Sequence, residues 1–104
     1  MTVVGAGGVR IDCFRKTRRF AKEYAKLDPI IRGRCDDRLE KLLLDPRPPG
    51  LGFEKLEGYS NPDLYTIHIN GNFKVSMEIR QDPNHGCVAI LRHVARHDLI
   101  DRSP

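Results

Sequence analysis

The spacing of the apolar residues changes once along this chain, and the change constrains the fold class. Between residues 17 and 44, apolar side chains recur at the intervals of an amphipathic helix. From Phe53 onward they alternate with polar residues, as in strands that bury one face. Arg47–Gly52, which holds two prolines and two glycines, separates the two patterns. The sequence therefore predicts helices followed by an antiparallel sheet.

The helical part divides in two at Asp28-Pro29, because aspartate is a favoured N-cap and proline fits the first helical position. The first apolar stripe, within about residues 17–27, consists of Phe20, Tyr24 and Leu27. The second stripe, which precedes Asp45-Pro46, consists of Ile31, Cys35, Leu39 and Leu42. A connection this short favours two antiparallel helices.

Strands are expected both before and after the helices in the sequence. They are Val9–Phe14, Phe53–Leu56, Leu64–Ile69, Phe73–Arg80 and Cys87–Leu91. The predicted fold is α+β, with two N-terminal antiparallel helices packed on one face of a twisted, mainly antiparallel sheet of four or five strands. The opposite face is expected to be open, concave and polar. At 104 residues the chain suits one domain, residues 9–104, after a flexible tail at residues 1–8.

The alternation also predicts the register of one hairpin. Opposed residues of an antiparallel pair share a face, and a two-residue turn would place polar His68 opposite apolar Phe73. A three-residue loop, 70–72, instead opposes Ile69 with Phe73 and His68 with Lys74. The polar face of this hairpin then gathers Thr66, His68, Lys74 and Ser76.

Positive charge is concentrated in the N-terminal third of the chain. Residues 10–41 hold eleven Lys/Arg and six Asp/Glu, an excess of five within a total net charge of +4. The densest part is Arg15, Lys16, Arg18 and Arg19. Such a patch attracts phosphate backbones or an acidic protein, although a solvated helix face has the same composition.

Several classes of protein are disfavoured. The chain has neither an apolar run of about 20 residues nor a signal-peptide pattern at its start, so a cytoplasmic protein without membrane contact is expected. Cys13, Cys35 and Cys87 are spaced too widely for a CxxC motif and are expected to be reduced. His93 and His97 lie four residues apart but have no evident third ligand, so neither a metal nor a cofactor is predicted.

The segment 92–98, with the sequence RHVARHD, holds the densest group of residue types that commonly act in catalysis. The alternative interpretation is a solvated chain end without a catalytic role. Ribonucleolytic chemistry needs a base for the ribose 2′-hydroxyl, cations for the developing phosphorane charge and an acid for the leaving oxygen. Histidine, lysine and arginine on one sheet face can supply all three.

Five segments together resemble the RelE/ParE superfamily of bacterial type II toxin–antitoxin toxins, over about residues 9–102. They are FAKEYAKLDP (20–29), LEKLLLDP (39–46), GLGFEKLEG (50–58), LYTIHINGNFKV (64–75) and VARHD (94–98). The resemblance implies a small basic toxin that an acidic cognate antitoxin holds inactive. Operator DNA would be contacted only through the toxin–antitoxin complex.

The RelE-like branch is favoured, and it implies a ribosome-dependent mRNA endonuclease that inhibits translation. By motif position the catalytic residues would be His68, Lys74, Arg96 and His97. The residues expected to bind nucleic acid are Arg15, Lys16, Arg18, Arg19, Arg80 and Arg92. Thr66 stands where a lysine is common in the branch, and the chain leaves almost no room for a terminal helix.

Two other functions fit the same resemblance. A ParE-like member would poison DNA gyrase without nuclease chemistry. A degenerate, non-toxic member would act as a partner of the antitoxin or of operator DNA. The two toxin branches differ in whether the polar face of the hairpin carries the activity.

Overall fold

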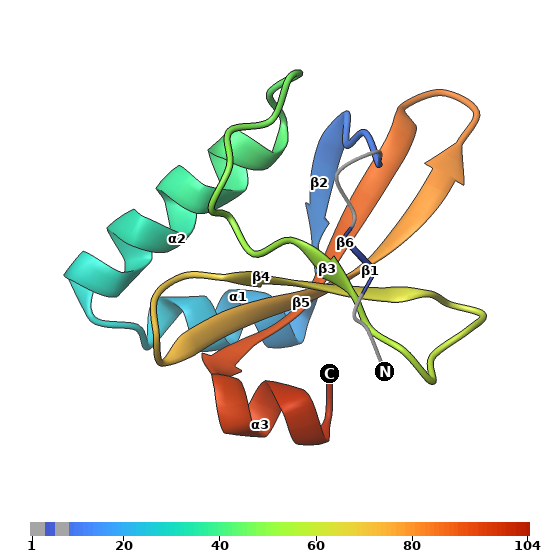
Figure 1. Ribbon diagram of the computed structural model, residues 1–104. Coiled ribbons are helices and arrows are strands. Elements are labelled where there is room, and N and C mark those ends of the chain that lie inside the picture. The colour runs from blue at the N-terminus through green and yellow to red at the C-terminus, as the bar shows by residue number, and fades with distance from the viewer. Residues whose placement is uncertain (1–3, 6–8) are drawn as a thin grey trace.

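One sheet joins all the strands of residues 4–5 and 9–104, the part of the chain that the computed structural model describes (Figure 1). The strands are β1 (Val4–Gly5), β2 (Cys13–Lys16), β3 (Glu54–Lys55), β4 (Leu64–His68), β5 (Phe73–Asp82) and β6 (Gly86–Arg96). The helices are α1 (Arg18–Ala25), α2 (Pro29–Leu42) and α3 (His97–Arg102). The strand order is β1-β3-β4-β5-β6-β2, and only β2 and β6 pair in parallel.

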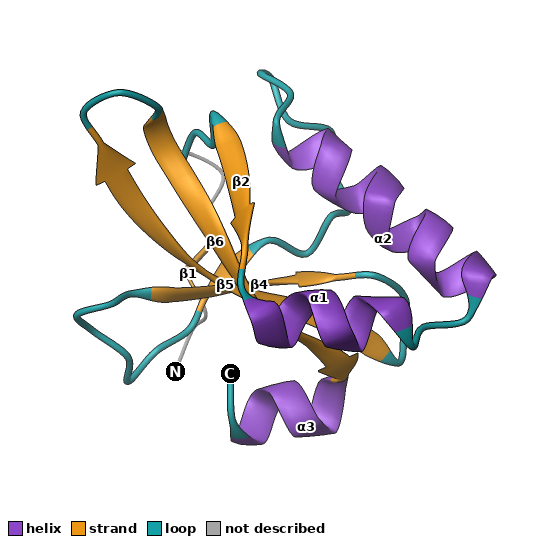
Figure 2. Cartoon of the chain, turned by 180° about the vertical axis from the view of Figure 1, so that it is seen from behind, coloured by secondary structure: helices purple, strands orange, loops and turns teal. Residues whose placement is uncertain are grey.

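The predicted pair of N-terminal helices on one face of the sheet is wrong. Strands precede the helices, and β2 runs parallel to β6 from Cys13 opposite Val88 to Lys16 opposite Leu91. The chain therefore leaves the edge of a mixed sheet to enter α1. In both views α1 and α2 diverge from their connection at the side of the sheet, instead of lying antiparallel on it (Figures 1 and 2).

The first strand also differs from its prediction. The expected first strand, Val9–Phe14, is displaced to β2 because pairing with β6 continues through Lys16. Of the expected flexible tail, the structure describes Val4 and Gly5, which form β1 beside β3. Residues 1–3 and 6–8 lie outside the described residues.

The helix start predicted at Asp28-Pro29 is confirmed, and the structure adds an N-cap at Thr17 for the preceding helix. The Thr17 hydroxyl accepts a hydrogen bond from the Phe20 amide (3.1 Å) and caps α1. The Asp28 carboxylate accepts one from the Ile30 amide (2.9 Å), and Pro29 is the first residue of α2. Both caps satisfy amides that have no partner within the first turn.

The apolar stripes meet the sheet in a single core. Phe20 of α1 is fully buried, as are Cys35 and Leu42 of α2. The sheet contributes alternate residues of its central strands, including Ile67, Val75, Met77, Ala89 and Leu91. Burial of these apolar surfaces is the main force that holds the helices to the sheet.

The predicted hairpin register is confirmed. The Ile69 amide donates to the Phe73 carbonyl oxygen (2.9 Å), and His68 lies opposite Lys74. The Asn70 side-chain oxygen accepts hydrogen bonds from the amides of Asn72 (2.8 Å) and Phe73 (2.9 Å). A single asparagine thus closes the three-residue loop.

The prediction of an open polar face is wrong. The chain turns back after β6, where the His97 amide donates to the Asn72 carbonyl oxygen (2.7 Å), and α3 follows at once. Ile100 of α3 is fully buried, and so is Ser76, whose hydroxyl donates to the Pro104 oxygen (3.0 Å). Residues 97–104 therefore form a helix and a tail that contact the polar face of β4 and β5.

Candidate functional site

Three of the four predicted catalytic residues gather where the β4–β5 hairpin meets α3. His68 lies opposite Lys74, and the Lys74 ammonium contacts the Asp101 carboxylate at 2.9 Å. The other oxygen of Asp101 lies 3.6 Å from Nδ1 of His97, one helical turn earlier. We call His68, Lys74, His97 and Asp101 the histidine–lysine cluster. Its members come from two strands and a helix.

His68 is half-buried and is held from several sides. Its amide donates to the Leu51 carbonyl oxygen (3.3 Å), and its own carbonyl oxygen accepts from Nε of Arg38 (2.9 Å). Burial lowers the pKa of His68, and the nearby Lys74 ammonium lowers it further. The imidazole is therefore neutral at neutral pH and can accept a proton.

Gly52 fixes the position of the His68 ring. It has a φ of +65°, and a Cβ placed there would lie 2.4 Å from Cδ2 of His68. We expect Gly52→Ala to displace the ring and to strain the loop, because side chains rarely adopt this backbone conformation. A changed chemical shift of the His68 ring protons would report the displacement. The matched variant Gly33→Ala, which meets no atom within 4 Å, should leave this resonance in place.

Asp101 is the member of the cluster that the sequence analysis missed. The hydrogen bond from Lys74 is the main cause that lowers the pKa of Asp101. The Lys74 side chain is only 13% exposed, so Asp101 balances the charge of an ammonium group that is largely shielded from water. The sequence signal that could have identified Asp101 is its spacing of four residues from His97, which places both on one side of a helix. That signal requires a helix at residues 97–102, which was not predicted.

We expect Asp101→Asn to lower the free energy of unfolding at pH 7 by up to about 1 kcal/mol, because half of the Asp101 side chain is exposed. The pKa of Asp101 is lower in the folded chain than its ordinary 3.8. The contribution of Asp101 to the free energy of unfolding is therefore present above pH 3.8, and it is lost as the pH falls through the pKa of the folded state. Urea unfolding at pH 7 and about pH 2 measures both values. An equal loss at the two pH values would contradict this pairing.

The fourth predicted catalytic residue, Arg96, lies at the rim of the cluster. It ends β6 directly before His97, its side chain is 62% exposed, and its Nε lies 4.0 Å from the Asp98 carboxylate. Arg96 pairs in register with Phe73, next to Lys74. It is placed beside the cluster without contacting Asp101.

The four basic residues of the predicted patch lie on β2 and α1, and all are exposed. Arg15 lies 3.8 Å from Asp82, and Arg19 lies 3.8 Å from Glu23. The Lys16 ammonium lies 5.6 Å from the centre of the Tyr24 ring, and Arg18 is the first residue of α1. These side chains form an exposed basic surface, and their ion pairs and ring contacts involve other residues than the histidine–lysine cluster.

Arg80 and Arg92 do not belong to that basic surface. Both contact the nearly buried Glu78, at 2.7 Å and 3.1 Å. Glu78 lies opposite Leu64, at the other end of the polar face from His68 and Lys74. The two arginines therefore neutralise a carboxylate at the far end of this face.

His93 is not placed to bind a metal with His97. It is buried, its Nδ1 lies 2.6 Å from Oε1 of Glu23, and its Nε2 lies 3.4 Å from the Arg19 guanidinium. These contacts connect β6 to α1. Within residues 4–5 and 9–104, no group of three or more His, Cys, Asp or Glu side chains could hold a metal ion.

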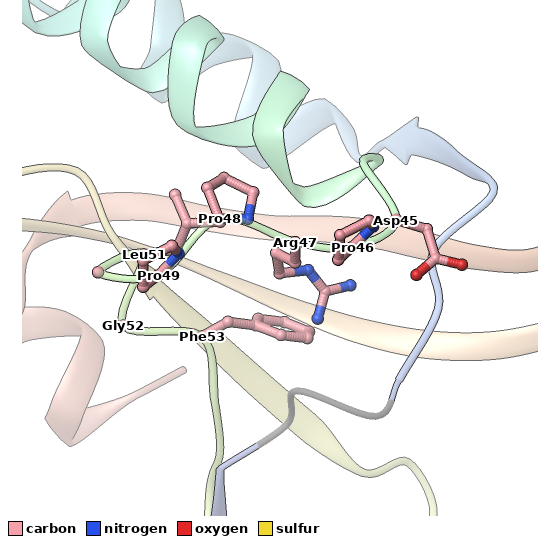
Figure 3. Close-up of a pocket in the computed structure, with 9 residues that line it drawn as sticks. Asp45, Pro46, Arg47, Pro48, Pro49, Leu51, Gly52 and Phe53 are labelled. Atoms are coloured by element: carbon pink, nitrogen blue, oxygen red, sulfur yellow. The ribbon is translucent and has the colours of Figure 1, made fainter.

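A cavity of about 410 Å³ lies along residues 45–53, where the Arg47 guanidinium stacks over the Phe53 ring at 4.8 Å (Figure 3). Arg47 also donates to the carbonyl oxygens of Val9 (2.6 Å) and Leu42 (3.2 Å). Burial lowers the pKa of Arg47. These contacts hold the loop that carries Gly52 against the core, so this arginine has a structural role next to the cluster.

Comparison of the chain with protein-family models, curated proteins and solved structures finds no match. Among the described residues, no helix is long and apolar enough to cross a membrane. Its function is therefore inferred from the histidine–lysine cluster and from the charge of the surface.

Proposed function

We propose that this chain is an endoribonuclease, the toxin of a type II toxin–antitoxin module, which cleaves mRNA on the ribosome and inhibits translation. The observation that carries the proposal is the histidine–lysine cluster: His68 opposite Lys74, with His97 connected to them through Asp101. The likeness to RelE-like toxins, described above, supports the choice of mRNA as the substrate.

In the proposed reaction His68 acts as the general base. Its neutral imidazole accepts the proton of a ribose 2′-hydroxyl, and the 2′ oxygen forms a bond to the neighbouring phosphorus. His97 donates a proton to the 5′ oxygen as the bond between this oxygen and phosphorus breaks. The products are a 2′,3′-cyclic phosphate and a 5′-hydroxyl. The carboxylate beside Nδ1 of His97 orients this ring and leaves Nε2 to face the leaving oxygen.

Lys74 and Arg96 stabilise the negative charge that develops on the phosphate. An ammonium group has three donors, and Asp101 occupies one of those of Lys74. The exposed guanidinium of Arg96 can bind phosphate oxygens in a fork. Lys74 is therefore the inner cation of the site, and Arg96 is the outer one.

The exposed basic surface supports the proposed partners. Arg15, Lys16, Arg18 and Arg19 attract ribosomal RNA, and the same charge suits an acidic antitoxin in the cytoplasm. The antitoxin complex would contact operator DNA. These partners follow from charge and from the family likeness.

Induction of the chain alone in a bacterial host tests the proposed function. Growth arrest, rapid loss of protein synthesis and new 5′ ends within translated mRNA are the expected results. Arrest with intact mRNA and damaged DNA would instead assign the chain to the gyrase poisons. Good expression without arrest would contradict both toxin functions and leave the non-toxic partner.

The pH dependence of cleavage should identify the base. Because the pKa of His68 is lowered, the neutral base persists below pH 6.5, and the acid limb of kcat/KM should lie below this value. Cleavage of ribosome-bound mRNA between about pH 5 and pH 8 measures the limb. A midpoint above 6.5 would contradict the assignment of His68 as the base.

A further inference from the structure

Residues 98–104 lie over the sheet face that carries the histidine–lysine cluster, on the side of β4 and β5 away from α2 (Figures 1 and 2). Thr66 and Ser76 on this face are fully buried, and the Lys74 side chain is largely covered. We propose that residues 98–104 are a lid, and that its Asp101 carboxylate occupies the place on Lys74 that a substrate phosphate must take. The inference rests on the proposed ribonuclease function and deepens it by describing how access to the same site is controlled.

The contact between Lys74 and Asp101 has the chemistry of a bound phosphate. The ammonium group donates to a carboxylate oxygen at 2.9 Å, and a phosphate oxygen is an acceptor of the same sign of charge. Because the Lys74 side chain is only 13% exposed, little of its ammonium group is left for a second anion. Carboxylate and phosphate also repel each other at such short range. A phosphate that binds Lys74 therefore has to displace Asp101.

The contacts that hold the lid are few and mostly polar. Of its residues, all within the described part of the chain, only Ile100 is buried. At the far end the Pro104 oxygen accepts hydrogen bonds from the Ser76 hydroxyl (3.0 Å) and from Nε of Arg92 (3.4 Å). Single hydrogen bonds and exposed ion pairs contribute about 1 kcal/mol each. An RNA strand that offers several phosphates can compete with contacts of this strength.

The closed lid leaves one polar group unsatisfied. Thr66 lies opposite Ser76, and its buried hydroxyl has no hydrogen-bond partner within the described residues. A buried polar group without a partner is unfavourable, because it has lost its hydrogen bonds to water. Opening of the lid would return water to this hydroxyl. Thr66 therefore favours the open state and limits the stability of the closed one.

Opening does not separate the proposed acid from its carboxylate. His97 begins α3 and is tied to the hairpin loop, because its amide donates to the Asn72 carbonyl oxygen (2.7 Å). Asp101 lies one helical turn later, 3.6 Å from Nδ1 of His97. When the helix turns away about His97, Asp101 leaves Lys74 and stays beside this imidazole. The same carboxylate closes the site in one state and orients His97 in the other.

Binding of inorganic phosphate to the full chain, followed by backbone amide NMR, tests the lid without any cleavage. Asp101→Asn should bind phosphate at Lys74 about five-fold more tightly, because the neutral amide does not compete with an anion. The matched control is Asp37→Asn, which removes the same charge from an exposed ion pair with Lys41 on α2. This control should change phosphate binding by less than about two-fold, since solvent and salt screen a distant surface charge.

The methyl resonances of Ile100 report the movement of the lid itself. An oligodeoxynucleotide has no 2′-hydroxyl and therefore cannot be cleaved by the proposed reaction. Its addition should move the Ile100 resonances toward those of Ile30, which is already exposed on α2.

The outcomes separate the lid from the reaction. Tighter phosphate binding by Asp101→Asn in a chain that cleaves no RNA would retain the lid and contradict the proposed function. RNA cleavage by the unaltered chain, with equal or weaker phosphate binding by Asp101→Asn, would overturn the lid. Oligodeoxynucleotide binding at Lys74 with unmoved Ile100 resonances would overturn it as well. A well-dispersed spectrum of Asp101→Asn shows that a changed affinity does not reflect unfolding.

Discussion

Replacement of His68 by alanine should lower the rate of ribosome-dependent mRNA cleavage by about 100- to 10,000-fold, the contribution typical of a general base. The imidazole that accepts the proton would be absent, while Lys74 and Arg96 would still bind phosphate. The loss should therefore fall on kcat more than on KM. Single-turnover cleavage of a defined mRNA on purified ribosomes measures both.

His85→Ala is the matched control for this variant. His85 lies in the β5–β6 turn, is exposed, and contacts Asp82 at 3.2 Å, so its loss should leave cleavage unchanged. His68→Gln keeps a polar side chain against Gly52 and separates loss of the base from loss of packing. If His68→Ala retains full toxicity in cells, the polar face of the hairpin does not carry the activity.

Phe20→Ala should have the largest effect on stability. Phe20 is the only buried residue of α1, it is fully buried, and its ring stacks on Tyr24 with centroids 6.0 Å apart. Removal of a buried phenylalanine ring costs about 3–5 kcal/mol, since both transfer energy and packing are lost. Small domains have a total stability of only about 5–15 kcal/mol. The variant should therefore be close to unfolded at 37 °C.

Urea unfolding followed by far-UV circular dichroism measures this loss. Ile30→Ala is the control, because Ile30 is 74% exposed on α2 and its removal should change the free energy of unfolding by less than about 0.5 kcal/mol. A loss below 1 kcal/mol for Phe20→Ala would mean that α1 does not depend on this contact.

Local signals explain the parts of the fold that could be predicted. The N-caps at Thr17 and Asp28 act within three residues, and the alternation on both sides of residues 70–72 permits only an odd loop. The sequence alone therefore determined where α2 begins and that His68 opposes Lys74. Each of these features depends on neighbours in the chain or on a single hairpin.

Long-range contacts decided the rest. Strand β2 pairs with β6 across more than seventy residues, and no local pattern records that partner. Asp101 reaches Lys74 only because α3 folds back after β6, and the same turn covers the polar face that was expected to be open. Backbone pairing and burial select such contacts among many that the same residues could make. The sequence by itself thus determined the residue types of the candidate site, and the tertiary structure determined which carboxylate completes it.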